Sequence, residues 1–448
     1  MTDFTSALYL GLQHASATQP GWDALTLGRP AALQEPCGAE DVAADLARLQ
    51  GLPAATLLPS TLHLFWDLLR LLARDARSAV LLDAGAYPIL HWAAEGAAAV
   101  GARVHRFAHH DAAALAQLAG RAARTGLRPV VVCDGFCPGC NRAAPLHAYA
   151  RIVESCGGAL VLDDTQALGV LGRAPSTACP YGHGGGGSLH WQGLSDLQMG
   201  AHIVVGASLA KGFGAPLAAL SGSEALIARF RRDSETRVHC SPPSVAVVHA
   251  ARCALDAAEQ WGDAWRARLL RLVLLLRETL ARAGLAAVGW LPFPVQSFVS
   301  RHGPGVAQLL QRLHAGGGVR AADARLLPGP GAAAELHRHG AAQRGADRAR
   351  RAAAGAQRRC AAFRPDPQHV CHQLRRRHAS PCRLCRAATL HGRVRSTGTR
   401  GVRNPRRELR AGARPPRWSA APTTSGAAQR WPQRHTTRPY RQRREAWP

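Results

Sequence analysis

Short runs of apolar residues alternate with helical segments from residue 80 to residue 163, and this alternation limits the fold more than any other feature of the chain. The runs are continuously apolar, whereas a strand with one wet face would alternate apolar and polar residues. We therefore expect an α/β fold in which helices cover both faces of a mostly parallel sheet. Strands are expected at 80–83, 104–107, 130–133 and 159–163, and helices at 92–100, 112–125 and 146–155.

Aspartates stand at the carboxyl ends of three of these strands. Asp83 and Asp163 are the last residues of their strands, and Asp134 follows directly after another. Parallel strands bring their carboxyl ends to one edge of the sheet, where the ligands of such folds bind. A carboxylate buried there is costly unless it meets a cation. The pattern predicts a site at this edge with Asp163 facing a cationic ligand; capping of the following turn is the alternative role.

Lys211 is the only lysine in the sequence, which contains 55 arginines. Arginine stays protonated, whereas a desolvated lysine can lose its proton and attack a carbonyl carbon to form an imine. Lys211 lies in the apolar, glycine-rich segment 206–216, after an expected strand at 201–206 and before a second apolar segment at 217–222. We interpret Lys211 as an imine-forming residue, with an ordinary surface lysine as the alternative.

An apolar helix is expected at 62–72, with Ser60 or Thr61 as its N-cap. The free N–H groups at such a helix start can also bind an anion. Capping without anion binding is the alternative. Further helices are expected at 38–50 and, as long stretches, at 244–283.

The formal net charge of +27 suggests a nucleic-acid-binding protein until its distribution is considered. Residues 321–448 hold 29 arginines and 6 acidic residues, whereas residues 1–320 carry a net charge of only +4. The body is thus near neutral, and we do not expect it to bind nucleic acid. The tail has too few core-forming residues to fold and is predicted to be disordered. RNA binding by this arginine-rich tail is the alternative from another class of protein.

No apolar stretch is long enough to cross a membrane, and no basic-then-apolar leader opens the chain. We expect a cytoplasmic protein without a membrane partner, whose cysteines are reduced thiols. The segment Cys137-Pro138-Gly139-Cys140 could suggest zinc. A structural zinc site usually needs a second ligand pair, however, and none is evident in the sequence. We therefore expect a tight turn there and no metal site.

Three segments resemble the cofactor motifs of the α-oxoamine synthases, the 8-amino-7-oxononanoate synthase-like family of fold-type I pyridoxal phosphate enzymes. These segments are 162–172, 208–214 and 240–243. The resemblance covers about 38–320 and implies a large cofactor-binding domain at 38–243, preceded by an arm at 1–37. It also implies a long helix and the start of a small αβ domain at 244–320.

The resemblance implies roles for the matching residues. Lys211 would bind pyridoxal 5'-phosphate as an imine and move the α-proton of the substrate. Asp163 would keep the pyridine nitrogen protonated, which makes the ring an electron sink. Ser208 would contact the phosphate, as would the backbone around Ser60 and Thr61.

The family forms homodimers with shared sites, so the resemblance implies that Ser241 or the nearby His239 reaches the phosphate of the neighbouring subunit. Gln166 stands where a histidine usually bonds the ring oxygen; glutamine can donate there but cannot titrate. Tyr87 stands where a histidine usually stacks on the ring, and it keeps the stacking. The glycine usual in the phosphate turn is missing from 59–62.

The function implied by the resemblance is condensation of an amino acid with an acyl thioester. An aminotransferase of the same fold needs the same lysine and aspartate and is the alternative enzyme. Formation of pyridoxamine phosphate from an amino donor distinguishes the two.

The chain departs from the family pattern after about Arg320. The family continues there into an apolar strand that carries an arginine for the substrate carboxylate, whereas this chain becomes rich in arginine. Residues 334–341 can be encoded by a set of codons that gives Leu-Ser-Phe-Ile-Val-Thr when it is read one base later. That sequence is typical of a β-strand. We interpret 321–448 as read in a shifted frame, which implies a truncated small domain and an inactive or poorly folded product. A genuine basic extension is the alternative.

Overall fold

The computed structural model describes residues 2–3, 6–14, 19, 25–74, 77–194, 203–282, 285–300 and 319–320. The basic tail expected at 321–448 lies outside them. Residues 301–318, which form much of the expected small domain, also lie outside them.

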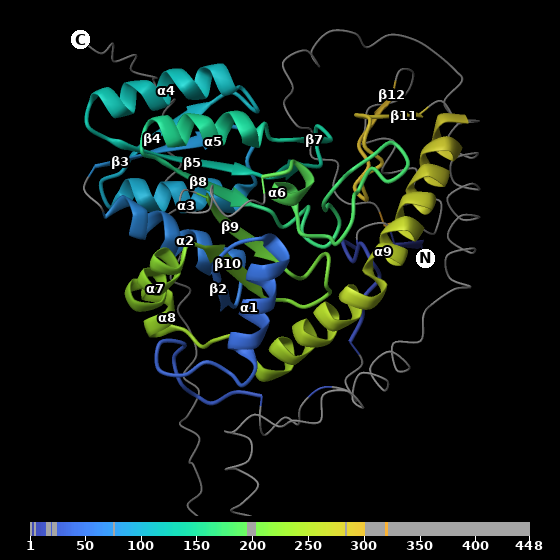
Figure 1. The fold of residues 1–448 in the computed structure, drawn as a ribbon, viewed down its shortest axis with the longest axis horizontal. Helices are drawn as coiled ribbons and strands as arrows, with labels where there is room; N and C mark the ends of the chain where they lie inside the picture. Colours follow the sequence, from blue (N-terminus) through green and yellow to red (C-terminus); the bar gives the residue numbers. More distant parts are fainter. Residues whose placement is uncertain are drawn as a thin grey trace, which may run out of the picture. The chain divides into compact units, whose positions relative to one another are not determined.

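A seven-stranded sheet forms the centre of the fold (Figure 1). Its strands are β2 (Ala54–Leu58), β3 (Ser78–Asp83), β4 (Arg103–Phe107), β5 (Arg128–Asp134), β8 (Ala159–Asp163), β9 (Ile203–Ser208) and β10 (Ala218–Gly222). They lie in the order β2-β10-β9-β8-β5-β3-β4. Strand β10 is antiparallel to β2 and β9, and the other neighbouring pairs are parallel. The mostly parallel α/β sheet that the sequence predicts is confirmed.

Helices pack on both faces of this sheet (Figure 1). They are α1 (Ala39–Gln50), α2 (Thr61–Ala73), α3 (Pro88–Ala99), α4 (Ala112–Arg124), α5 (Leu146–Ser155), α6 (Ser188–Trp191), α7 (Glu224–Asp233), α8 (Glu235–His239) and α9 (Val245–Arg282). Helices α2, α3 and α7 share a core with one face. Helices α4 and α5 pack on the other face, where α1 and α9 cover the end formed by β2 and β10.

Successive residues of one strand enter different cores, which explains the continuously apolar runs. In β3, Val80 and Leu82 pack with α2 and α3, whereas Ala79 and Leu81 pack with α4 and α5. All four side chains are buried. Each strand residue removes apolar area from water, at about 25 cal/mol per Å², whichever face it points to. A polar residue inside such a run would lose that stabilisation on either side of the sheet.

Several element boundaries differ by a few residues from the sequence prediction, and two of these differences have a clear local cause. Helix α3 begins at Pro88 rather than residue 92, because proline fits the first helical position and Tyr87 before it is extended. Strand β9 continues to Ser208, two residues beyond the expected end, because its pairing with β10 extends to Ser208 opposite Ala218. The long helical stretches expected after residue 244 form one 38-residue helix, α9.

Three two-stranded sheets complete the described structure. They are β6 (Phe136–Cys137) with β7 (Arg142–Ala143), β11 (Leu285–Ala287) with β12 (Phe298–Ser300), and β1 (Thr2–Asp3) with β13 (Val319–Arg320). The first is a hairpin whose loop holds the tight turn expected after Cys137. Among the helices of the described residues, none combines the length and apolarity needed to cross a membrane.

Candidate active site

The strand pairing brings the predicted site residues to one edge of the sheet. Asp134 on β5 pairs with Asp163 on β8, and Asp163 pairs with Gly206 on β9. At the end of β9, Ser208 pairs with Ala218, which in turn pairs with the last residue of β2. Neighbouring strands lie about 4.8 Å apart, so residues far apart in the sequence meet along this edge.

Lys211 lies in the tight turn that leads from β9 to β10. The Phe213 N–H donates to the Leu209 carbonyl at 3.0 Å and closes this turn. Gly212 packs so tightly that a Cβ atom there would lie 2.5 Å from the Leu168 carbonyl oxygen. The packing therefore holds the half-buried Lys211 side chain at the carboxyl edge of the sheet.

The Lys211 amine is desolvated. Burial lowers the pKa of Lys211, and the negative charges of Asp163 and Asp134 only partly oppose this shift. Among the described residues, the Lys211 amine forms no hydrogen bond and no ion pair. A lysine in this environment is more easily deprotonated than a surface lysine, which an imine-forming amine requires.

The carboxylate of Asp163 is buried, with the residue 5% exposed. Its Oδ1 atom accepts a hydrogen bond from the Thr165 N–H at 3.0 Å. Burial raises the pKa of Asp163, while the bonds from Thr165 and the charge of Lys211 lower it. Burial and then the nearby Asp163 charge raise the pKa of Asp134. No described cation forms an ion pair with either carboxylate. The structure therefore presents buried acids that a cationic ligand would stabilise.

Tyr87 lies beside Lys211. The ring centroid of Tyr87 is 5.8 Å from the Lys211 Nζ atom, and the Tyr87 N–H donates to Asp134 Oδ1 at 3.2 Å. The side chain is 44% exposed, so a ligand at this edge could contact it. The structure thus places Tyr87 at the same edge as the predicted lysine and aspartate.

Gln166 also lies at this edge, where its side-chain oxygen accepts a hydrogen bond from the Tyr9 hydroxyl. The backbone N–H of Tyr9 donates to the Lys211 carbonyl at 3.2 Å. No described residue accepts a hydrogen bond from the Gln166 amide nitrogen. Because Tyr9 occupies the oxygen, the amide N–H groups of Gln166 are available to a ligand.

Ser60 and Thr61 begin α2 beyond the end of β2. The Ser60 hydroxyl accepts from the His63 N–H at 3.4 Å, which confirms the predicted N-cap. The first two N–H groups of the helix, on Thr61 and Leu62, have no partner among the described residues. They are donors that an anion could use.

His239 and Ser241 lie at a separate place, at the end of α8 and in the segment before α9. Both side chains are exposed, and neither forms a hydrogen bond or ion pair within the described residues. The structure therefore does not bring them together with Lys211 in one subunit.

Two contributors to this edge escaped the sequence interpretation. Thr165 joins two strand ends, because its N–H bonds Asp163 and its hydroxyl accepts from the Ser208 N–H at 2.9 Å. Its place two residues after Asp163 could have indicated this role. Tyr9 could not have been found, because nothing in the sequence links it to Gln166, 157 residues away.

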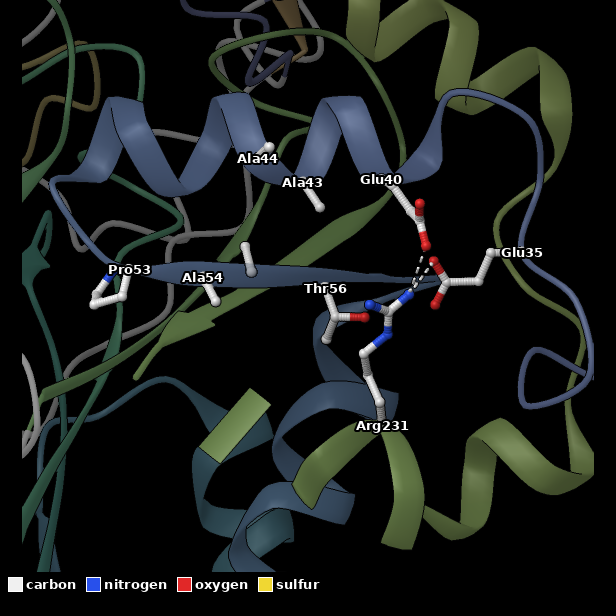
Figure 2. A pocket seen from close by; sticks show the side chains of 9 residues that line it. Glu35, Glu40, Ala43, Ala44, Pro53, Ala54, Thr56 and Arg231 are labelled. Carbon is white, nitrogen blue, oxygen red and sulfur yellow. Dashed lines mark ion pairs between the residues drawn. The ribbon is translucent and has the colours of Figure 1, made fainter. Parts of the chain in front are cut away.

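A pocket elsewhere in the fold is separate from this candidate site. It lies between α1, β2 and α7, and none of the predicted site residues lines it (Figure 2). Arg231 reaches into it and pairs with Glu35 at 3.1 Å and Glu40 at 3.6 Å. Arg237 also pairs with Glu35, at 2.7 Å, so the charged side chains around this pocket pair with one another.

The buried carboxyl groups predict a pH dependence of stability. Burial raises the pKa of Asp164 from 3.8 to about 7. Between these values the folded chain holds a proton that the unfolded chain has released, so stability falls as pH rises. Asp164→Asn should therefore gain stability relative to the wild type between pH 4 and 7, by up to about 1.4 kcal/mol per pH unit. Urea unfolding of both proteins at several pH values measures this; a constant difference would contradict it.

These observations define a class of protein: an α/β fold with a desolvated lysine and a buried aspartate at the carboxyl edge of its sheet. The sequence profile of the family described as aminotransferase class I and II matches residues 4–300. The chain therefore belongs to this family.

Similar proteins place the chain near one branch of the family. It is 32% identical to the 8-amino-7-oxononanoate synthase of Nitrosococcus oceani over 225 residues, 50% of this chain and 55% of that protein. It is 32% identical to the enzyme of the same name from Thioalkalivibrio sulfidiphilus over 213 residues, 48% of this chain and 50% of that protein. The chain thus spans about half the length of the curated relatives it matches.

Solved structures share the fold. A serine palmitoyltransferase from S. paucimobilis, with a bound adduct of pyridoxal phosphate and myriocin, has a TM-score of 0.62 at 16% identity. The match covers 79% of this chain and 88% of that one. An 8-amino-7-oxononanoate synthase from Francisella tularensis has a TM-score of 0.54 at 18% identity, covering 71% of this chain and 87% of that one. These likenesses confirm the predicted fold-type I architecture.

Proposed function

We propose that the protein is a pyridoxal phosphate-dependent transferase that condenses an amino acid with an acyl thioester. The observation that supports it best is the pairing of strand ends that places Asp163 beside the strand leading to Lys211. The similarity to 8-amino-7-oxononanoate synthases supports the same reaction type.

The residues present fit the cofactor. The buried carboxylate of Asp163 has no cationic partner among the described residues, and a protonated pyridine nitrogen would supply one. The Lys211 amine and the amide nitrogen of Gln166 are likewise unbonded within the described structure. When bound, the cofactor supplies a carbonyl group and an electron-withdrawing ring that accepts the electron pair of a carbanion.

The positions of the side chains support the roles proposed for them. Asp163 would hold the proton on the pyridine nitrogen, and its fixed bond from Thr165 keeps its carboxylate oriented. Lys211 would take the α-proton of the amino acid, because its lowered pKa leaves more of the amine unprotonated. The Tyr87 ring would pack against the cofactor ring and shield one face from water. Gln166 would donate to the ring oxygen.

Phosphate binding is assigned to Ser60, Thr61 and Ser208 at the strand ends. We expect Ser60→Ala to weaken pyridoxal phosphate binding by about 10-fold, because it loosens the first turn of the helix that donates to the phosphate. Fluorescence titration with the cofactor measures this loss. Ser223→Ala is the matched control, since Ser223 caps α7 through the Leu226 N–H in the same way. Equal cofactor affinity in the Ser60 variant and the control would contradict the assignment.

The active unit is proposed to be a homodimer, in which the exposed His239 or Ser241 reaches the phosphate of the other subunit. Light scattering of the cofactor-loaded protein tests this proposal. A monomer that binds the cofactor at full occupancy would contradict it.

Thiol release tests the reaction itself. The full chain with pyridoxal phosphate is incubated with single amino acids and acyl thioesters, and the free thiol and the product mass are measured. Condensation predicts thiol release that depends on both substrates. Formation of pyridoxamine phosphate without thiol release would instead identify an aminotransferase of the same fold.

A further inference from the structure

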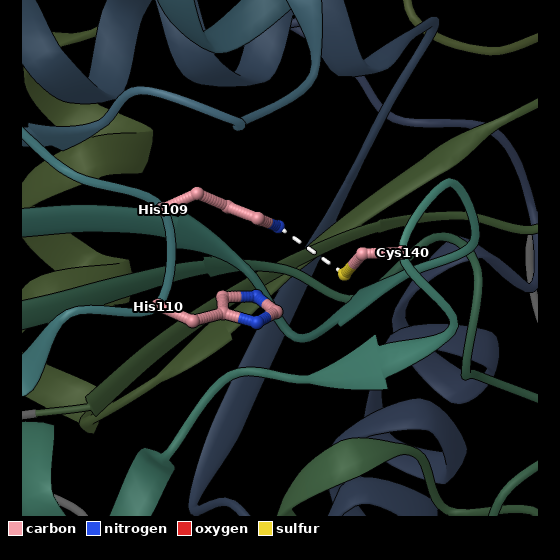
Figure 3. A group of neighbouring side chains, drawn as sticks. All are labelled: His109, His110 and Cys140. Carbon is pink, nitrogen blue, oxygen red and sulfur yellow. Dashed lines mark hydrogen bonds between the residues drawn. The ribbon is translucent and has the colours of Figure 1, made fainter. Parts of the chain in front are cut away.

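A cluster of histidines and cysteines lies at the opposite end of the strand edge from Lys211. His109 and His110 follow β4, and Cys137 and Cys140 flank the turn of the β6–β7 hairpin. Ligand atoms of His109, His110 and Cys140 all lie within 4.8 Å of one another (Figure 3). The two imidazole rings are stacked, with centroids 3.7 Å apart.

Asp83 at the end of β3 orients both histidines. Its Oδ1 atom accepts a hydrogen bond from His109 Nδ1 at 2.7 Å, and its Oδ2 atom accepts from the His110 N–H at 3.1 Å. With Nδ1 of His109 bonded to the carboxylate, Nε2 faces Cys140 Sγ at 3.4 Å. A carboxylate behind a histidine in this way is the usual support of a metal-binding imidazole.

His110 provides a second, independent observation. The residue is only 9% exposed, and its Nδ1 atom has no hydrogen-bond partner among the described residues. Its backbone also adopts φ 61°, a conformation that non-glycine residues rarely take. A buried polar atom without a partner is unfavourable, and a ligand bound to this ring would remove that cost.

Cys137 is the nearest candidate for a fourth ligand. It lies three residues before Cys140, and its backbone carbonyl accepts a hydrogen bond from the Cys140 thiol at 3.9 Å. Two imidazoles and one thiol therefore converge, and a second cysteine stands beside them at the Cys-x-x-Cys spacing common in zinc sites. We propose that Cys137, Cys140, His109 and His110 bind a structural zinc ion.

The ligand chemistry and spacing favour zinc. Two thiolates with two imidazoles form the tetrahedral set typical of structural zinc. Zinc–nitrogen and zinc–sulfur bonds of about 2.05 and 2.3 Å place tetrahedral ligands about 3.6 Å apart. The 3.4 Å between His109 Nε2 and Cys140 Sγ is already close to that separation. The alternative for this thiol pair is a disulfide, which would leave His110 without a partner.

The ion would also brace the segment that carries Tyr87. The Gly85 N–H donates to Asp83 Oδ1 at 2.8 Å, and a Cβ atom on Gly85 would lie 2.3 Å from His109 Nδ1. The backbone between β3 and α3 therefore packs directly on the histidine. Zinc binding does not depend on the proposed transferase reaction, and its test needs neither cofactor nor substrate.

Zinc content and affinity test the proposal. The full chain is reduced, stripped with a chelator, and titrated with zinc sulfate against a chromophoric chelator; elemental analysis gives the stoichiometry. We expect one zinc per chain. Cobalt chloride should give thiolate-to-cobalt charge-transfer absorbance together with the visible bands of tetrahedral cobalt.

Variants separate the site from adventitious binding. Cys140→Ser and His110→Asn should each lower zinc affinity at least 100-fold; asparagine tolerates the backbone conformation of His110. Asp83→Asn should lower it about 10- to 100-fold, because it removes the carboxylate behind His109. Cys156→Ser is the matched control, since Cys156 follows α5 outside the cluster, and its affinity should match the wild type.

Two results would overturn the proposal. One is the absence of stoichiometric zinc and of tetrahedral cobalt bands in the reduced wild-type protein, with or without a Cys137–Cys140 disulfide before reduction. The other is zinc binding that Cys140→Ser lowers no more than Cys156→Ser does. The cobalt spectrum of the wild type decides the question even if a variant fails to fold.

Discussion

Replacing Lys211 with alanine should abolish the condensation, with a loss of at least about 1,000-fold in kcat. Under the proposed function, the variant would lose both the amine that binds the cofactor and the base that moves the α-proton. The fold should survive, because the half-buried side chain forms no hydrogen bond or ion pair within the described residues. Thiol release under saturating substrates measures the loss, and circular dichroism checks the fold.

Lys211→Arg is the matched control for charge. It keeps the cation but stays protonated, so we expect the same loss of activity as with alanine. Retention of more than about a tenth of the wild-type kcat in Lys211→Arg would show that the lysine acts only as a positive charge, since loss of a general base costs about 100-fold or more.

Asp163→Asn should lower kcat by about 100- to 1,000-fold, the usual cost of losing one preorganised electrostatic group. Asparagine keeps the shape and can still accept the Thr165 hydrogen bond, but it cannot hold a proton on the pyridine nitrogen. The effect should be on kcat, because the electron-withdrawing ring matters when the carbanion forms.

Asp163→Asn should lower kcat but raise the thermal stability of the cofactor-free protein. Burial raises the pKa of Asp163, so the ionised carboxylate is unfavourable in the cofactor-free fold at pH 8. Asp163→Asn removes that cost, and the melting temperature of the cofactor-free protein should rise by about 2–4 °C per kcal/mol gained. Asp134→Asn is the control: it should also stabilise the protein but lower kcat less than 10-fold, well below the loss expected of a group that acts on the cofactor. Equal losses of kcat in the two variants would contradict the assigned role.

The sequence was sufficient to predict the elements that have a strong apolar pattern of their own. The helix at 146–155 and the strand at 159–163 have the expected boundaries, because continuous apolar runs and helical periodicity leave few other solutions. The strand at Ala54–Leu58 was not predicted, since a five-residue run before a proline has too little pattern of its own. Its pairing with Ala218–Gly222, 164 residues later, decides its structure.

The site was predictable in part for the same reason. Lys211 and Asp163 were predicted as site residues from composition, strand ends and resemblance, and the strand pairing brings Asp163 beside the strand that leads to Lys211. The histidine–cysteine cluster was not predicted. His109 and His110 lie 27 residues or more before the cysteines, and only the sheet order brings β4, β3 and β5 side by side.

The shifted reading frame after about Arg320 stays a proposal, because residues 321–448 lie outside the described structure. Resequencing the codons for residues 310–335 tests it. An uninterrupted frame together with activity of the full chain would contradict the proposal. Cofactor attachment without condensation would agree with a site that is formed but lacks the carboxylate-binding arginine.

The most direct test of the account is reduction of the cofactor-loaded protein with borohydride, followed by peptide mass spectrometry. Because Lys211 is the only lysine of the chain, a lysine-bound cofactor can have only one position. We predict one pyridoxyl phosphate group per chain, attached to the Nζ atom of Lys211. Cofactor that washes away after reduction, or that is found only on the terminal amine, would contradict the central claim.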